Sequence, residues 1–126
     1  YYRLLMSQDT EGRERARAGL VDGLSEFAGQ MDPTGPYFTG GQFTWADLAL
    51  APWYERLRTV AAAYRSFEMP VDSVATARLD RWFKAVRARP SVAVTLANEA
   101  ELVRNYAGYA DDSATSDASR QFRGAV

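Results

Sequence analysis

A short segment in the middle of the chain carries the signals that begin a helix. Thr44 is placed to accept a hydrogen bond from the backbone N–H of Asp47, and the Asp47 carboxylate is placed to accept one from the N–H of Thr44. This pattern is a capping box, with Asp in place of the usual Glu or Gln. Phe43 before the cap and Leu48 at the fourth helical position form the matching hydrophobic staple. The segment therefore predicts a helix that begins directly after Thr44.

The residues that follow predict that this helix is enclosed. All six residues from Leu48 to Trp53 are apolar, and a helix that is apolar on every side is a buried helix. Water cannot satisfy the first N–H groups of a buried helix, which explains why the cap is needed. We therefore predict a central buried helix over about 45–64, with Ala49 and Leu50 out of contact with solvent. Pro52 inside it removes one backbone hydrogen bond and predicts a bend between Leu48 and Pro52.

The rest of the chain predicts an all-α helical bundle. Apolar residues recur at helical spacing, and turn residues such as Asp32-Pro33 and Gly40-Gly41 separate the periodic segments. No alternating strand pattern stands out. The expected helices cover about 1–7, 11–31, 45–64, 74–88, 91–96 and 99–110. Residues 111–126 are small and polar, and we expect them to form a mobile tail after a single domain over 1–110.

Composition excludes several classes of function. The 126 residues include no cysteine and no histidine, so thiolate nucleophiles, Ser-His-Asp chemistry and His/Cys metal sites are not available in this chain. With 15 basic and 16 acidic residues, the chain has no net attraction to nucleic acid or to anionic membranes. The cluster of Arg13, Arg15 and Arg17 is interleaved with acids and is typical of a solvated helix face rather than of a phosphate site. No apolar run reaches membrane-spanning length, and we expect a cytoplasmic protein.

Two segments together resemble the C-terminal all-α domain of glutathione transferases. The first runs from Phe38 to Trp53, where Gly-Gly is followed by Thr, two residues, Asp and an apolar helix. The second runs from Arg78 to Val92 and contains Trp82 and Pro90 at the family's spacing. The resemblance covers about residues 11–110. Because the chain begins with Tyr1 in an already helical pattern, we expect a fragment whose first helix is truncated and which lacks the thioredoxin-like domain of the family.

A finer resemblance concerns substrate-binding residues. The run Pro52-Trp53-Tyr54-Glu55-Arg56-Leu57 is similar to the central helix of omega-class or related fungal-type transferases. The resemblance implies that Trp53 and Arg56 line the pocket for the hydrophobic co-substrate, and that Tyr109 lies near it. The omega pattern has a Trp where this chain has Leu102, which changes the expected pocket. The alternative is that Trp53 is a core residue and that Arg56 pairs with an acid such as Glu55 or Asp80. Tyr109 has its own alternative, as a packing or surface aromatic.

The same resemblance makes Thr44 and Asp47 a folding element rather than a catalytic pair, and we expect no catalytic residue and no metal ligand in this chain. It implies a parent enzyme that transfers glutathione to small electrophiles or performs glutathione-dependent thiol transfer, with glutathione as its substrate. The chain alone is expected to be inactive. The alternative function is a non-catalytic interaction module of the kind found in the elongation-factor gamma subunit.

Partners follow from the same reasoning. We expect a small electrophilic substrate, the thioredoxin-like domain and a second copy of the protein, and no nucleic acid or membrane. The apolar surface that such partners would cover is expected to be exposed in this chain. Its candidate residues are Tyr1, Tyr2, Leu4, Leu5, Trp53 and Tyr109.

Overall fold

The computed structural model describes residues 1–71 and 73–124, and within these ranges the regular elements are all helices. In chain order they are α1 (Tyr2–Met6), α2 (Thr10–Gln30), α3 (Trp45–Arg56), a π-helical turn (Leu57–Ala61), α4 (Ala62–Arg65), α5 (Val74–Arg87), α6 (Pro90–Ala93), α7 (Glu99–Asn105), α8 (Ala107–Ala110) and α9 (Asp117–Gly124). A single isolated bridge joins Tyr37 and Gly40 in the loop before α3. The all-α prediction is confirmed.

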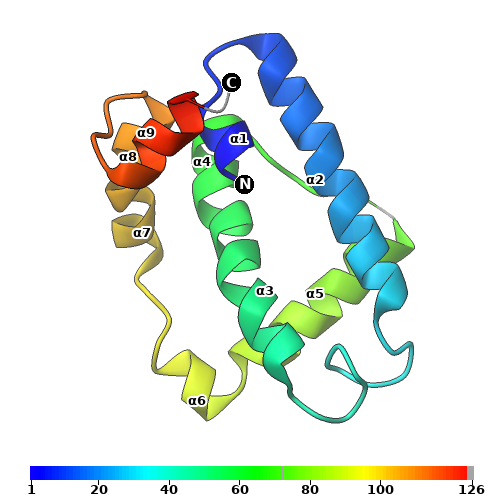
Figure 1. Ribbon diagram of the computed structural model, residues 1–126. Helices are drawn as coiled ribbons and strands as arrows, with labels where there is room; N and C mark the ends of the chain where they lie inside the picture. The colour runs from blue at the N-terminus through cyan, green and yellow to red at the C-terminus, as the bar shows by residue number, and fades with distance from the viewer. Residues whose placement is uncertain (72, 125–126) are drawn as a thin grey trace.

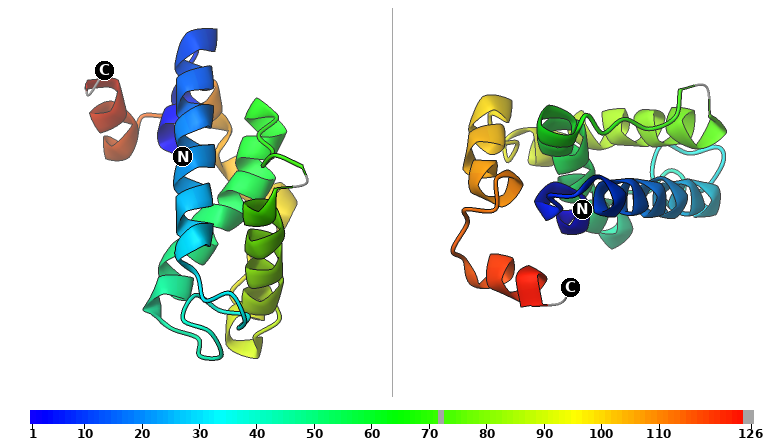
Figure 2. Two further views of the ribbon diagram at one scale, coloured as in Figure 1. Left: turned by 90° about the vertical axis from the view of Figure 1, so that its right-hand side faces the viewer. Right: turned by 90° about the horizontal axis from the view of Figure 1, so that it is seen from above.

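The helices gather around a central column made by α3, the π-helical turn and α4 (Figure 1). The long helix α2 packs against α5, and α5 also packs against α3. Helices α7 and α8 lie on the other side of the column from α2 (Figure 2). The main apolar core lies where α2, the column and α5 meet, and it contains Leu4, Leu24, Ala28, Met31, Ala51, Tyr54, Leu57, Ala61, Phe67, Leu79, Trp82, Phe83 and Val86.

The predicted helix start is present, and its acid does more than cap. Asp47 is fully buried, and its Oδ2 accepts from the backbone N–H of Thr44 at 2.8 Å and from the Thr44 hydroxyl at 3.2 Å. Its Oδ1 accepts from the backbone N–H of Phe38 at 2.9 Å and from the indole N–H of Trp82 at 2.8 Å. The Thr44 side chain faces the Asp47 N–H and completes the capping box. One carboxylate therefore joins the start of α3 to the preceding loop and to α5.

The prediction that α3 is enclosed on every side is wrong. One face is buried through Asp47, Ala51 and Tyr54, while Ala49 is exposed and Leu50 is only partly buried. Leu48 keeps 44% of its surface exposed, so the staple with Phe43 removes little apolar area from water. The cause is packing: among the described residues, α5 is the helix with extensive contacts to α3, and it covers a single face. A π-helical turn at Leu57–Ala61 follows α3, and the bend expected between Leu48 and Pro52 stays a prediction.

The start of the chain also differs from the expectation of exposure. Leu4 and Leu5 are completely buried, Leu4 in the main core and Leu5 in a smaller cluster with Val60 and Ala110. Short helix α1 is held between α2, α4 and α8. The Arg65 guanidinium donates to the backbone carbonyls of Leu4, Leu5 and Ala110, which satisfies acceptors at the ends of two helices where water has little access.

The remaining helices follow their local signals closely. Asp9, Ser73 and Asn98 each accept a hydrogen bond from a backbone N–H three residues on and cap α2, α5 and α7. The helix expected over 99–110 is interrupted at Tyr106, so α7 and α8 are separate. The segment expected to be a mobile tail contains α9, while residues 125–126 lie outside the described part. The mobility of this segment stays a prediction.

Replacement of Asp47 by Asn tests how much the fold depends on this carboxylate. An amide cannot accept four hydrogen bonds, and its NH2 group would face the N–H of Thr44 or of Trp82. Each buried donor left without an acceptor costs roughly 1–3 kcal/mol, so Asp47→Asn is expected to lower the free energy of unfolding by about 3–5 kcal/mol. Chemical denaturation followed by circular dichroism measures the change.

Two other substitutions serve as references for the loss of unfolding free energy in Asp47→Asn. Thr44→Ala removes only the capping hydroxyl and should cost ~0.5–2 kcal/mol. Asp80→Asn disturbs an exposed ion pair with Arg58 and should cost less than about 1 kcal/mol. An effect of Asp47→Asn no larger than that of Thr44→Ala would contradict the central role of Asp47.

Candidate functional site

The candidate substrate-binding residues lie on α3 and on the last helices of the domain. Trp53 and Arg56 are one helical turn apart on α3, so they project from neighbouring positions on its surface. Trp53 is 43% exposed, and the alternative that it is a core residue is therefore wrong. Tyr109 lies on α8 and is half-buried. The structure brings all three into one region because α7 and α8 return along the column, where α7 packs against the π-helical turn.

Arg56 is held by aromatic residues and not by an acid. Its Nε donates to the Tyr106 hydroxyl at 2.6 Å, and its Nη1 donates to the Pro52 carbonyl at 2.7 Å. The guanidinium carbon lies 5.4 Å from the centroid of the Trp53 ring and 5.7 Å from that of Tyr106, distances at which a cation is attracted to a ring face.

The acids that sequence reasoning offered as partners of Arg56 are engaged elsewhere. Glu55 lies nearest to Arg87, at 3.8 Å, and Asp80 pairs with Arg58. Within the described part of the chain, Arg56 takes part in no ion pair. Its positive charge is therefore balanced only by rings and neutral oxygens, and it keeps a capacity to hold an anion.

An aromatic cluster extends from Arg56 to the start of the chain. It consists of Tyr1, Tyr2, Trp53, Tyr106 and Tyr109, whose neighbouring ring centroids lie 5.2–6.4 Å apart. Such separations are typical of tilted and edge-to-face aromatic pairs. Phe122 on α9 contacts the cluster through Tyr2, with centroids 5.0 Å apart. The Tyr109 hydroxyl bonds to Ser116 at 2.8 Å, and its ring packs against Tyr2 and Tyr106 rather than against Arg56.

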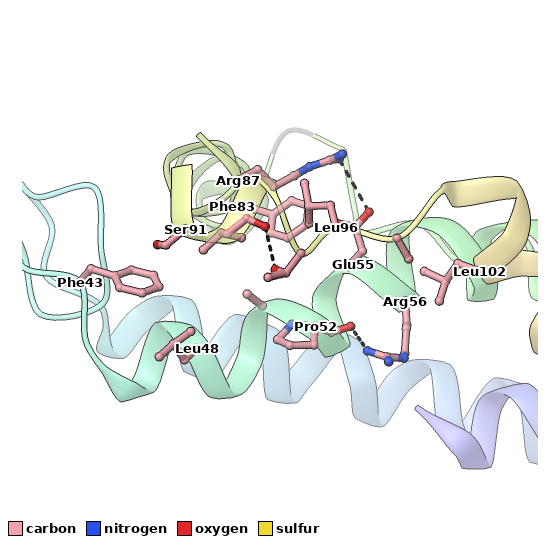
Figure 3. Close-up of a pocket in the computed structure, with 14 residues that line it drawn as sticks. Phe43, Leu48, Pro52, Glu55, Arg56, Phe83, Arg87, Ser91, Leu96 and Leu102 are labelled. Carbon is pink, nitrogen blue, oxygen red and sulfur yellow. Dashed lines mark hydrogen bonds and ion pairs between the residues drawn. The ribbon is translucent and has the colours of Figure 1, made fainter. Parts of the chain in front are cut away.

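Two open spaces flank α3. The first, which we call the Trp53 groove, has a volume of about 550 Å³ and is lined by α1, α2 and α3, with Trp53, Tyr1 and Tyr2 on its wall. The second, the α3–α5 cavity, has a volume of about 480 Å³ and lies between α3, α5 and the segment around α6 (Figure 3). Arg56 stands at the edge of the second space. Both volumes suit a small organic ligand.

Tyr106 is the contact residue that the sequence did not single out. Helical spacing puts Tyr106 on one face of the last expected helix with Leu102 and Val103, which is the ordinary position of a packing residue. The break between α7 and α8 at Tyr106 turns its hydroxyl to Arg56. The unusual density of tyrosine near both ends of the chain was the available signal, but it carries no information about which ring meets Arg56.

No group of His, Cys, Asp and Glu side chains in residues 1–71 and 73–124 is arranged to hold a metal ion. The residues that the region does contain offer stacking on aromatic rings, burial of apolar surface and one guanidinium for an anionic group.

Burial in the aromatic cluster raises the pKa values of two of its tyrosines. Desolvation raises the pKa of Tyr1, and it raises the pKa of Tyr2 to about 12. Desolvation also raises the pKa of Tyr54 in the core. The folded state therefore favours the neutral phenols. The unfolded chain loses these protons first, near pH 10, so stability is complete below that pH and falls as the pH rises toward 12.

This shift predicts an alkaline loss of stability that depends on the cluster. The unfolding midpoint in denaturant should be constant near neutral pH and should fall as the pH is raised from about 10. In Tyr2→Phe the fall should be smaller than in the original protein, because one of the shifted phenols is gone. Titration of tyrosinate by near-ultraviolet absorbance provides the independent measurement. If the unfolding midpoint of both proteins fell equally with pH, burial would not raise the pKa of Tyr2.

The sequence model described as Glutathione S-transferase, C-terminal domain matches residues 10–85. No curated protein matches the chain. The matched range includes α2, the central column and most of α5, and therefore Asp47, Trp53 and Arg56. Tyr106 and Tyr109 lie beyond it.

Proposed function

Because this chain belongs to the glutathione S-transferase C-terminal domain family, we propose that it forms the wall of a pocket for the second, hydrophobic substrate of a glutathione transferase. The observation that carries this proposal is the Arg56 guanidinium, held between Trp53 and Tyr106 without an acid partner among the described residues. An aromatic electrophile would lie against Trp53 in the Trp53 groove, and an anionic substituent on it would extend past the Trp53 ring to Arg56, which lines the edge of the neighbouring α3–α5 cavity.

The remaining chemistry is assigned to other parts of such an enzyme. Glutathione would be bound, and its sulfur activated, by a thioredoxin-like domain, since activation needs donors aimed at the thiolate. The parent enzyme would then transfer glutathione to the electrophile or reduce a mixed disulfide with it. We propose an omega-like or related fungal-type class from the similarity of Pro52–Leu57, a cytoplasmic setting and a homo-oligomer. Among the described helices, none is both long and apolar enough to cross a membrane.

Paired fluorescent probes test the role of Arg56. Anilinonaphthalene sulfonate and phenyl-naphthylamine share an aromatic body, but only the first carries an anion. Arg56→Gln should weaken binding of the sulfonate about three- to tenfold and leave the neutral probe almost unchanged, because only the charge-assisted contact is lost. Fluorescence titration of the whole chain measures both affinities.

Arg58→Gln is the matched control. Arg58 lies two residues further along the column and pairs with Asp80, so its loss should change neither affinity. If Arg56→Gln and Arg58→Gln behave alike, or if both probes weaken equally, Arg56 does not hold the anionic group and the proposed substrate site is wrong.

A second candidate function, a non-catalytic interaction module, is favoured by the exposed face of α3. Trp45, Leu48 and Trp53 are 84%, 44% and 43% exposed, and they occupy the part of α3 that faces away from its buried residues Asp47, Ala51 and Tyr54. Large apolar side chains gathered on one helix face are typical of a surface that another protein surface covers. The same face could receive the thioredoxin-like domain of a transferase, so the two functions share this feature.

The exposed face predicts self-association of the isolated chain. Sedimentation velocity should detect dimers or larger species whose fraction rises with concentration. The double substitution Trp45→Ser, Leu48→Ser should shift the chain toward the monomer, since it removes apolar area from the contact. Val74→Ser, which changes an equally exposed apolar residue on α5, serves as the control. Monomeric behaviour of the original chain at high concentration would exclude this surface as a contact between copies.

A further inference from the structure

The α3–α5 cavity contains a carboxylate whose hydrogen-bonding capacity is not used. Glu55 projects from α3 into the wall of this cavity (Figure 3). Its side chain is only 12% exposed, and its Oε2 is buried without a hydrogen-bond partner in the described part of the chain. A carboxylate that has lost most of its water without gaining hydrogen bonds is in an unfavourable state.

The nearest cation does not fully compensate for this. The Nη1 of Arg87 lies 3.8 Å from Oε1 of Glu55, which is too long for a hydrogen bond. Arg87 divides its charge with Glu99, whose Oε1 lies 3.7 Å from its other terminal nitrogen. The Glu55 carboxylate and the Arg87 guanidinium therefore lie next to each other at one end of the cavity. The carboxylate can still accept a hydrogen bond, and the guanidinium can still donate one.

The other walls of the cavity are mostly apolar. They come from α3, α5 and the segment around α6, and include Leu48, Pro52, Phe83, Val92 and Leu96. The volume of about 480 Å³ is that of a small ligand site. A ligand for this space needs an apolar body and one group that can both donate to Glu55 and accept from Arg87.

The charged side chains around the cavity limit which ligand group can bind there. Two arginines, Arg56 and Arg87, line the cavity and would repel a cationic ligand. Glu55 and the adjacent Glu99 would repel a carboxylate placed between them. A neutral hydroxyl group fits both limits, because it donates one hydrogen bond and accepts others.

We propose that the α3–α5 cavity is a second ligand site, separate from the Trp53 groove, that takes a neutral aromatic alcohol or phenol with its hydroxyl on Glu55 and Arg87. Small movements of the two side chains bring their free oxygen and nitrogen to the ligand. The site depends on Glu55 and not on Trp53, so its existence is independent of the proposed transferase function.

Two probes that differ only at the hydroxyl provide the test. Naphthol carries the donor, and methoxynaphthalene blocks it with a methyl group while adding apolar area. If burial of apolar surface alone drove binding, methoxynaphthalene would bind more tightly. With the hydroxyl bound to Glu55, naphthol should bind the original protein about tenfold more tightly. Probe fluorescence titration with the whole chain gives both affinities, and this comparison requires no variant.

Substitutions then locate the site. Glu55→Gln should reduce the preference for naphthol to about threefold or less, since a neutral amide is a weaker acceptor than a carboxylate. Glu26→Gln, an exposed position on α2, is the matched control and should leave the preference unchanged. Ala97→Trp places a large side chain at the cavity wall and should abolish binding of both probes. Circular dichroism melting of each variant verifies that it is folded.

Equal binding of the two probes by the original protein would overturn the proposal, as would a naphthol preference that survives Glu55→Gln. Binding that survives Ala97→Trp would place the ligand elsewhere. The sulfonate titrations with Arg56→Gln can fail or succeed separately, because they report on the charge of an anionic ligand, whereas both naphthalene probes are neutral and differ only in the hydrogen bond offered to Glu55.

Discussion

The buried carboxylate of Asp47 is the interaction on which the arrangement of the helices depends. It accepts hydrogen bonds at once from the N–H of Thr44, the residue that caps α3, from the N–H of Phe38 in the preceding loop and from the indole N–H of Trp82 on α5. A carboxylate without solvent contact is costly unless donors replace its hydration, and here four donors do so. Because these donors come from three different segments, a helix-capping residue also fixes the angle at which α3 meets α5.

The placement of α3 in turn determines where ligands can bind. One face of α3 is closed by α5 and the core, while the opposite face keeps Trp45, Leu48 and Trp53 in contact with solvent. The Trp53 groove and the α3–α5 cavity lie on either side of this helix. Neighbouring residues on one turn therefore serve different spaces: Trp53 lines the groove, and Glu55 lines the cavity. Arg56 lies between them, stacked against Trp53 and Tyr106.

Local signals predicted most of the fold. The cap of α3 at Thr44 and Asp47 and the turns at Asp32-Pro33 and Gly40-Gly41 were evident because each depends on residues within one or two turns of each other. Contacts between distant segments were not evident. The burial of Leu4 and Leu5 depends on Arg65 and α8. The exposure of Ala49 follows from the packing of α5 against a single face of α3. For the candidate site, the resemblance supplied Trp53 and Arg56, but the roles of Tyr106 and of the largely buried Glu55 side chain emerged only from packing.

The amino-acid sequence by itself determined that this chain is helical, where its main helices begin, and that thiolate and imidazole groups are not available in it, because these properties follow from residue types and short spacings. The tertiary structure alone decided which side of α3 faces water, which acids stay away from Arg56 and that a carboxylate and a guanidinium meet at the end of an apolar cavity. Those properties arise from residues separated by thirty or more positions, and no local pattern records the distance between them.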